Sequence, residues 1–177
     1  MDEISDTGLD CINKITDKIY LGDIDGAREV DYLKKQGIKH IINLAGNVFS
    51  PTYEEGLFIR KNIEIMDFPE ENIFQYFKEC IDFIEKADKI YIHCMAGVSR
   101  SASIVIAYIM WKEHKKYNEA FSFVKKYRFI YPNYGFIYQL KYFEKLLVEN
   151  KYDLDKIDFK QFDTKEKWNN FLNKMND

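Results

Sequence analysis

Residues 89–109 constrain the fold more than any other part of the chain. This stretch reads KIYIHCMAGVSRSASIVIAYI and joins two different hydrophobic periodicities. Residues 89–93 are β-branched and aromatic, which is typical of a short buried strand. Residues 101–111 instead place apolar side chains at helical spacing. The residues between them therefore form a tight loop that leads from a buried strand directly into the N-terminus of a helix.

The loop at residues 94–100 is suited to binding an anion. Successive backbone N–H groups of such a loop converge on one point, and the unpaired N–H groups of the following helix add positive potential there. Arg100 stands where the helix begins and can offer a planar fork to two oxygens of one phosphoryl group. Cys94 lies at the floor of the same field, which favours the thiolate, and the thiolate is a nucleophile.

The motif His-Cys-x-x-Gly-x-x-Arg-Ser at residues 93–101 resembles the signature of the cysteine-dependent protein tyrosine phosphatase superfamily. The form AGVSRS is similar to the dual-specificity branch and its small atypical members. The segments IYLG at 19–22, GIKHIINL at 37–44 and PNYGFIYQL at 132–140 resemble the same branch. The resemblance covers about residues 15–148. A buried cysteine in an ordinary strand-to-helix turn is the alternative interpretation of the motif.

The resemblance implies a role for each residue of the motif. Cys94 is expected to be the nucleophile, and Arg100 is expected to hold phosphoryl oxygens. His93 is expected to fix the loop and tune the thiolate by hydrogen bonding. Ser101 matches the hydroxyl that assists departure of the thiolate when the phosphoenzyme breaks down, although a plain first-turn serine is the alternative. The phosphate-binding residues are expected to be Met95, Ala96, Gly97, Val98, Ser99 and Arg100.

A phosphatase also needs a proton donor, because the leaving oxygen otherwise departs as a strong base. Asp67 directly follows a predicted strand and begins a loop that Pro69 stiffens. The family's general acid lies in a comparable loop before a comparable helix, so the resemblance supports Asp67. Glu70 and Glu71 are close enough in the sequence to compete for the role. A solvated loop carboxylate is the alternative for Asp67.

The order of the predicted elements favours an α/β fold. We expect a central mixed sheet with a parallel core flanked by helices, and the resemblance implies a three-layer domain of the dual-specificity phosphatase type. Cys80 lies on the apolar face of a predicted helix and is expected in the core. We predict strands at 15–21, 38–44 and 89–93, a further strand within 58–66 that is clearest at 62–66, and helices at 27–36, 73–84, 101–111, 118–127 and 135–149.

We divide the chain into three parts. Residues 1–14 form a polar N-terminal lead-in, residues 15–149 the dual-specificity phosphatase catalytic domain and residues 150–177 a C-terminal tail. The tail contains apolar residues at helical spacing, which predicts a short amphipathic helix. This helix either packs back on the domain or binds a partner. Its apolar residues are Trp168, Phe171, Leu172 and Met175.

Composition limits the partners and cofactors of the chain. A net charge of −3 gives no electrostatic case for binding nucleic acid or an anionic membrane. No apolar run approaches the roughly 20 residues of a membrane span, and no signal-peptide pattern opens the chain. The three cysteines fit a reducing compartment and form no metal-ligand pattern with the three histidines. We expect a cytoplasmic protein, with the nucleus as a second compartment, that uses no metal or other cofactor.

The expected function is a protein phosphatase that acts on phosphotyrosine and on phosphoserine or phosphothreonine of a phosphoprotein substrate. The reaction would pass through a cysteinyl-phosphate intermediate. The same chemistry could serve a phosphoinositide, an RNA 5′-phosphate or a glycan phosphate, but Glu70 and Glu71 would repel a polyanion. A phosphate-binding scaffold without catalysis is the third hypothesis. Cys94 and Arg100 argue against a scaffold, because a pure binder needs no reactive thiol.

Overall fold

The structure, a computed structural model, describes residues 10–176, so residues 1–9 of the predicted lead-in lie outside the described residues. The strands are β1 Ile12–Lys14, β2 Ile19–Gly22, β3 His40–Asn43, β4 Ile59–Asn62 and β5 Ile90–His93. The helices are α1 Val30–Lys35, α2 Phe77–Lys86, α3 Arg100–Lys112, α4 Tyr117–Lys125, α5 Tyr134–Glu149 and α6 Lys165–Asn176.

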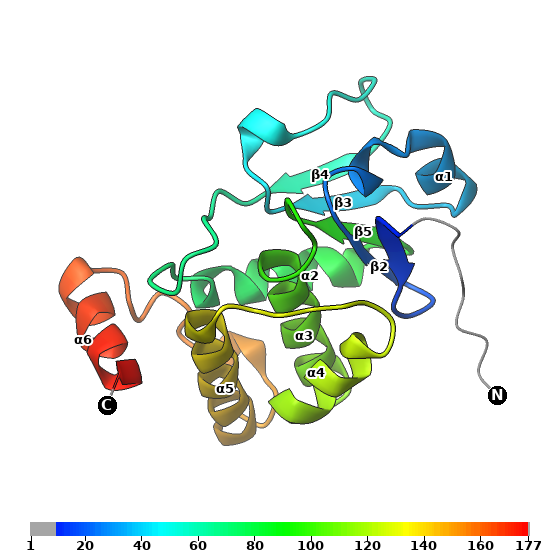
Figure 1. Cartoon of the computed structure of the whole chain (residues 1–177). Helices are drawn as coiled ribbons and strands as arrows, with labels where there is room; N and C mark the ends of the chain where they lie inside the picture. The colour runs from blue at the N-terminus through cyan, green and yellow to red at the C-terminus, as the bar shows by residue number, and fades with distance from the viewer. Residues whose placement is uncertain (1–9, 177) are drawn as a thin grey trace.

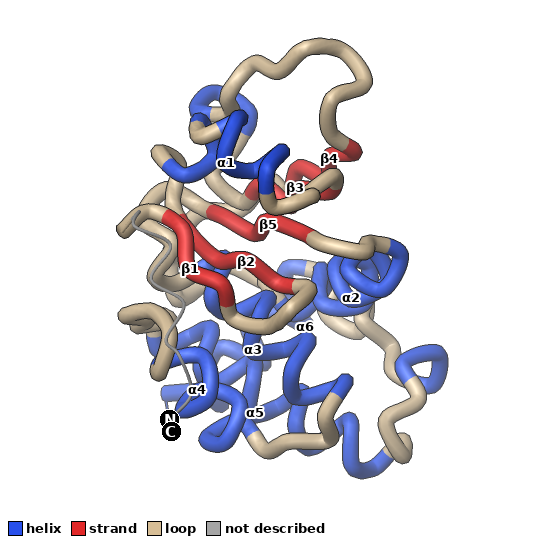
Figure 2. The backbone as a smooth tube through the Cα atoms, turned by 90° about the vertical axis from the view of Figure 1, so that its right-hand side faces the viewer, coloured by secondary structure: helices blue, strands red, loops and turns tan. Residues whose placement is uncertain are grey.

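The strands form one mixed sheet in the order β1-β2-β5-β3-β4. Strand β1 pairs antiparallel with β2, whereas β2, β5, β3 and β4 run parallel to one another. Helix α1 covers one face of the sheet, and helices α2 to α5 lie on the other face (Figures 1 and 2). The predicted α/β fold, with a parallel core and flanking helices in three layers, is therefore confirmed.

Both faces of the sheet are buried along β2, β5 and most of β3, because successive side chains point to opposite sides and helices cover both sides, whereas the edge strand β4 is largely exposed. Tyr20, Ile41 and Tyr91 belong to a small core on the α1 side, together with Leu33 of α1. The larger core lies under the other helices and includes Cys80, which is 0% exposed as predicted. Burial raises the pKa of the Cys80 thiol. The larger core takes these side chains from β2 and β5: Ile19, Leu21, Ile90 and Ile92.

Two parts of the sheet differ from the prediction. The predicted strand within 58–66 is confirmed, but it was expected too late in the chain, because the ladder with β3 runs from His40 opposite Ile59 to Asn43 opposite Asn62. Ile63 and Ile65, which follow Asn62, are buried but have no neighbouring strand in the sheet to pair with. Strand β1 was not predicted, because it is short and pairs through its backbone at the edge of the sheet.

The parallel strands place their carboxyl ends at one edge of the sheet, which is where ligands bind in open α/β folds. His93 at the end of the central strand β5 lies opposite Gly22 on one side and Asn43 on the other. Cys94 follows His93 and therefore lies at this edge. Within the described part of the chain, no helix is both long and apolar enough to cross a membrane.

Candidate active site

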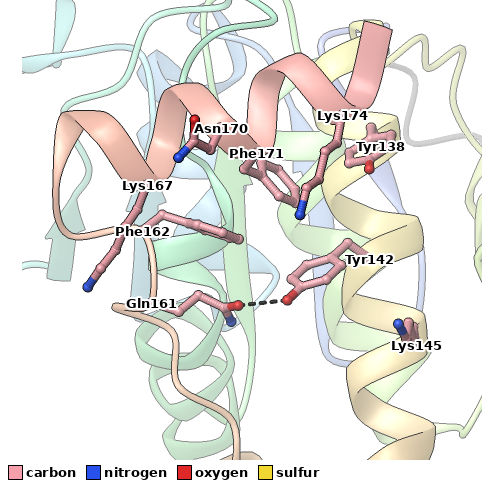
Figure 3. A pocket seen from close by; sticks show the side chains of 9 residues that line it. All are labelled: Tyr138, Tyr142, Lys145, Gln161, Phe162, Lys167, Asn170, Phe171 and Lys174. Carbon is pink, nitrogen blue, oxygen red and sulfur yellow. Dashed lines mark hydrogen bonds between the residues drawn. The ribbon is translucent and has the colours of Figure 1, made fainter. Parts of the chain in front are cut away.

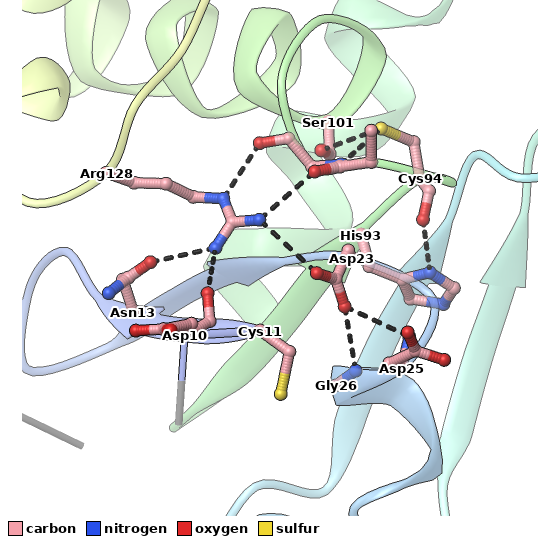
Figure 4. Close-up of polar contacts among 12 residues, drawn as sticks. Asp10, Cys11, Asn13, Asp23, Asp25, Gly26, His93, Cys94, Ser101 and Arg128 are labelled. Atoms are coloured by element: carbon pink, nitrogen blue, oxygen red, sulfur yellow. Dashed lines mark hydrogen bonds and ion pairs between the residues drawn. The ribbon is translucent and has the colours of Figure 1, made fainter. Parts of the chain in front are cut away.

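The sulfur of Cys94 lies at the floor of the loop between β5 and α3. Cys94 is 2% exposed. The Gly97 N–H donates a hydrogen bond to the Cys94 Sγ over 3.2 Å, and the buried Ser101 hydroxyl lies 3.2 Å from the same sulfur. Figure 4 shows the Ser101 side chain directed at the sulfur. Two polar groups therefore face Cys94, and both can donate a hydrogen bond to a thiolate.

The carbonyl groups of residues 95–98 all accept hydrogen bonds from groups outside the loop. In a trans peptide unit the C=O and the following N–H point in opposite directions, and the described residues contain no cis peptide bond. The N–H groups of residues 96–99 are therefore turned toward the inner side of the loop. The four outer bonds are Ile24 N to Met95 O (3.1 Å), Arg128 Nη2 to Ala96 O (3.1 Å), Arg128 Nε to Gly97 O (2.9 Å) and Tyr131 N to Val98 O (2.9 Å).

Arg128 supplies two of these four donors and was not predicted from the sequence. Its Nη1 also donates to the Asn13 Oδ1 over 2.8 Å and to the Asp10 carbonyl over 3.0 Å. Its Nη2 lies 3.7 Å from the Asp23 carboxylate, and only 9% of the side chain is exposed. Arg128 thus joins the loop to the edge strand β1 and to the residues just before it (Figure 4). The one sequence signal was an arginine in the connection between two predicted helices, whose other residues are mostly aromatic or apolar.

Gly97 is required by the shape of the loop. Its φ is +67°, a left-handed conformation that disfavours residues with a Cβ. A Cβ at this position would also collide with the Gly22 carbonyl and lie 2.7 Å from the Arg128 Nη2. The glycine therefore lets the loop pack against both β2 and Arg128.

Arg100 is the first residue of α3. Its Nη1 donates to the Leu44 carbonyl over 2.9 Å and to the Ile65 carbonyl over 3.1 Å. These bonds fix the guanidinium across the carboxyl edge of the sheet. Its Nε is buried without a hydrogen-bond partner. A buried N–H without a partner is costly, so this atom is ready for an acceptor that a ligand supplies.

Asp67 is hydrogen-bonded to the loop. The Ser99 hydroxyl donates to the Asp67 Oδ1 over 2.7 Å, and the Asn133 Nδ2 donates to the same oxygen over 2.8 Å. The Asn133 N–H in turn donates to the Ser99 Oγ over 3.0 Å. Glu70 and Glu71 make no side-chain hydrogen bond within the described part of the chain. Of the three candidate carboxylates, Asp67 alone is therefore tied to the loop among the described residues.

Asn133 was not assigned to the site from the sequence. Its side-chain oxygen accepts from the Phe136 N–H over 2.9 Å and caps α5. This cap fixes the side chain so that its amide nitrogen reaches Asp67. The signal in the sequence was a Pro-Asn pair before a predicted helix, which indicates a cap and carries no information about a second partner.

His93 is 1% exposed, and its Nδ1 lies 3.2 Å from the Cys94 carbonyl oxygen. A carbonyl oxygen can only accept, so Nδ1 carries the proton. The imidazole also stacks on Tyr91, with ring centroids 5.4 Å apart. Burial lowers the pKa of His93 to about 4, so the ring is neutral near neutral pH.

Comparison with known proteins places this geometry in a family. Residues 19–146 match the family described as dual specificity phosphatase, catalytic domain. The chain belongs to the dual specificity phosphatase family. A human structure titled tyrosine phosphatase-like serine/threonine/tyrosine-interacting protein is 35% identical, with a TM-score of 0.73 over 77% of this chain and 97% of that one. The matched residues therefore span strands β2 to β5, the loop at 94–100, helices α1 to α4 and most of α5.

Two curated relatives illustrate the range of this family. Dual specificity protein phosphatase 1B of Arabidopsis thaliana is 35% identical over 78% of this chain and 85% of its own length. MAP kinase phosphatase with leucine-rich repeats protein 1 of Dictyostelium discoideum is 47% identical over 74% of this chain and 16% of its own length. The chain thus spans less than a fifth of the latter relative.

Substitution of Arg128 by Met should weaken oxyanion binding to the loop. Loss of the guanidinium leaves the part-buried Gly97 carbonyl without its donor, at about 1–3 kcal/mol, and also removes the donor of the more exposed Ala96 carbonyl. We expect the affinity for tungstate, measured by calorimetry, to fall at least about 10-fold. Arg28→Met, which removes an exposed arginine paired with Asp25, should leave the affinity unchanged. Equal affinities of both variants would contradict the role given to Arg128.

Burial of neutral His93 should make stability depend on pH. Between the ordinary pKa of about 6.5 and the folded pKa of about 4, the unfolded chain binds the proton more tightly, so stability falls as pH falls. From about pH 7.5 to about pH 4.5 this histidine should remove about 2 to 3 kcal/mol from the free energy of unfolding in urea. His93→Phe should lose that part of the pH dependence, whereas His114→Gln, at an exposed position, should keep it. Identical pH slopes for wild type and His93→Phe would refute this assignment.

Proposed function

We propose that this chain is a dual-specificity protein phosphatase that hydrolyses phosphotyrosine and phosphoserine or phosphothreonine through a phosphate bound to Cys94. The observation that carries the proposal is the outward bonding of every carbonyl from residue 95 to residue 98. It directs the N–H groups of residues 96–99 inward, above a buried cysteine sulfur. A phosphoryl group has the oxygens to accept from them, and a cysteine at this position is placed to attack its phosphorus.

In the first step the Cys94 sulfur attacks phosphorus, the S–P bond forms and the bond to the leaving oxygen breaks. The loop N–H groups stabilise the negative charge on the equatorial oxygens. The unpaired Nε of Arg100 donates to one of these oxygens and so gains its missing partner. The Arg100 Nη1 stays bonded to the Leu44 and Ile65 carbonyls, which holds the guanidinium in place.

Asp67 protonates the leaving oxygen in this step. Its Oδ1 accepts hydrogen bonds from Ser99 and Asn133. Its Oδ2 has no hydrogen-bond partner among the described residues, so this oxygen can carry the proton. The two bonds to Oδ1 fix the carboxyl group beside the loop. Orientation of this kind is what general acid catalysis requires.

In the second step water attacks the phosphorus of the cysteinyl phosphate while Asp67 accepts a proton from that water. The S–P bond breaks, inorganic phosphate forms and the electron pair returns to the sulfur. The Ser101 hydroxyl, 3.2 Å from the sulfur, donates a hydrogen bond to the departing thiolate. His93 does not transfer a proton in this scheme, because its Nδ1–H is bonded to the Cys94 carbonyl.

A phosphoprotein is the substrate class that the surroundings of the loop favour. Phe68, Tyr131 and Tyr134 adjoin the site in the sequence or through backbone bonds, and they are 55%, 71% and 61% exposed. Exposed rings suit the uncharged residues that flank a phosphorylated side chain. A phosphoinositide or another polyanion would need cations here and would meet Glu70 and Glu71 instead.

One structural relative carries the words "interacting protein" in its name, so phosphate binding without catalysis is the alternative to consider. The presence of both Cys94 and Arg100 supports catalysis. The Dictyostelium relatives are named MAP kinase phosphatases, and we include MAP kinases among the candidate substrates for this reason. Such a substrate is consistent with residence in the cytoplasm and nucleus. We also propose that residues 15–149 form the catalytic domain, because every residue assigned above except Asn13 and Asp10 lies within them.

Cys94→Ser should abolish hydrolysis of a chromogenic aryl phosphate assayed without added metal. The hydroxyl is a far weaker nucleophile than the thiolate at neutral pH. The variant should still bind tungstate, because the four outward carbonyl bonds do not involve the sulfur. Cys80→Ser is a second cysteine variant that should keep its turnover wherever it folds, since Cys80 belongs to the core. Turnover by folded Cys94→Ser protein would sink the cysteine mechanism.

Asp67→Asn should cost most when the leaving group is a poor one. Phosphotyrosine releases a phenol with a pKa near ~10, so loss of the acid should lower kcat/KM about 10²- to 10⁴-fold. An aryl phosphate with a nitrophenol leaving group needs less protonation and should lose less. Glu70→Gln and Glu71→Gln serve as matched carboxylate variants and should leave both rates near wild type. If either of these produces the selective loss, Asp67 is the wrong residue.

A further inference from the structure

The loop that carries Asp67 is held from several sides. We call residues 67–72 the Asp67 loop. Besides the bonds of Asp67 itself, the Gln139 Nε2 of α5 donates to the Glu71 carbonyl over 2.9 Å. A Cβ at Gly135 would collide with the Pro69 carbonyl, so the loop lies directly against the first turn of α5. Asn133, Gly135 and Gln139 all lie within the part of the chain that matches the family.

One further contact comes from beyond that part. Trp168 of α6 donates from its indole Nε1 to the Glu70 carbonyl over 2.7 Å. Helix α6 follows the family-matched residues 19–146. Figure 1 shows α6 beside the segment that connects β4 to α2. A segment outside the shared domain therefore touches the loop that bears the proposed general acid.

Helix α6 is anchored to α5 by aromatic rings. Phe171 is 7% exposed, and its ring centroid lies 5.2 Å from that of Tyr138 and 5.2 Å from that of Tyr142 (Figure 3). Trp168 stacks on Phe171 at 5.3 Å and contacts Phe162 at 5.6 Å. A cavity of 590 Å³ adjoins these rings. The ring contacts thus carry much of the packing that holds Trp168 over the loop.

The hydrogen bond to the Glu70 carbonyl can affect the position of Asp67 because the residues between them form a compact turn. The Glu71 N–H donates to the Phe68 carbonyl over 3.1 Å, so residues 68–71 are closed by a backbone hydrogen bond. A displacement of Glu70 therefore shifts Phe68, which is directly bonded to Asp67. Asp67 is exposed, so its position depends on its bonds from Ser99 and Asn133 and on the turn that carries it.

We propose that α6 positions the general acid, with Trp168 holding the Asp67 loop against the catalytic loop through the Glu70 carbonyl. This inference rests on the proposed function, because it assigns Asp67 the role of acid. Trp168 is a positioning residue: it acts through the Asp67 loop and touches no reacting atom. Its loss should therefore resemble a partial loss of Asp67 and should leave the nucleophile intact.

Trp168→Phe is the informative variant, because it removes the indole N–H and keeps an aromatic ring against Phe171 and Phe162. The chain offers a matched control in Trp111 of α3, whose indole Nε1 donates to the Tyr152 carbonyl over 3.0 Å. Trp111→Phe deletes the same kind of hydrogen bond at a site without a contact to the Asp67 loop. Both variants are to be measured in the full chain, with wild-type circular dichroism as the criterion of folding.

The readout is kcat/KM for phosphotyrosine and for a nitrophenyl phosphate. One hydrogen bond contributes about 1 kcal/mol, so Trp168→Phe should lose about 3- to 10-fold on phosphotyrosine. It should lose less than about 2-fold on the nitrophenyl ester, whose leaving group needs little protonation. Trp111→Phe should change neither rate. In an Asp67→Asn background, Trp168→Phe should cause no further loss on phosphotyrosine.

Other outcomes overturn the inference in distinguishable ways. Three outcomes refute the role of α6 and leave the proposed function standing. They are equal losses on both substrates, an equal effect of Trp111→Phe, and wild-type rates for Trp168→Phe. A selective loss that persists in the Asp67→Asn background does the same. If wild-type protein hydrolyses neither ester, or Asp67→Asn shows no selectivity, the proposed function fails first. Should Trp168→Phe not fold, Phe171→Leu, which removes the ring contacts with α5, must give the same selective loss.

Discussion

The candidate site depends on hydrogen bonds that turn the carbonyls of one short loop outward. Three of the four donors lie about 30 residues after the loop, on Arg128 and Tyr131, and the fourth is the N–H of Ile24, which follows β2. Strand β5 lies between β2 and β3, so the loop emerges where these donors can reach it. The proposed anion site is therefore a product of the whole fold, although its residues form a continuous motif.

The motif itself was predictable because it combines two local signals, a β-branched strand and a helical apolar stripe, with a reactive residue between them. Asp67 was named as a candidate from its place after a predicted strand and from the family resemblance, yet its partners Ser99 and Asn133 were not identified as such. A side chain that caps a helix and binds a distant carboxylate shows only the local half of its role in the sequence. Arg128 was missed for the same reason. Four groups accept hydrogen bonds from it and the Asp23 carboxylate forms an ion pair with it, and all five partners lie 31 to 118 positions away in the chain.

The errors in the predicted sheet have a related cause. Ile63 and Ile65 alternate with polar residues as a strand would, and both are buried. A strand also needs a neighbour in register, and β3 ends at Asn43. The alternation of apolar and polar residues in the sequence predicts which side chains are buried. Whether the segment pairs as a strand depends on where the neighbouring strand ends. The fold class was secure because it follows from the order of elements, which tolerates shifts at their ends.

The proposed general acid and the proposed nucleophile are held by different means. The cysteine lies in a rigid loop bonded on four sides, while Asp67 lies on an exposed turn that depends on contacts with α5 and α6. The central claim, that this loop focuses its N–H groups on a phosphoryl group attached to Cys94, is tested most directly by trapping the intermediate. Enzyme mixed with phosphotyrosine and denatured during turnover should yield one phosphorylated peptide, with the phosphate on the Cys94 sulfur. Phosphate on Ser99 or Ser101, or turnover without any phosphorylated peptide, would contradict the account.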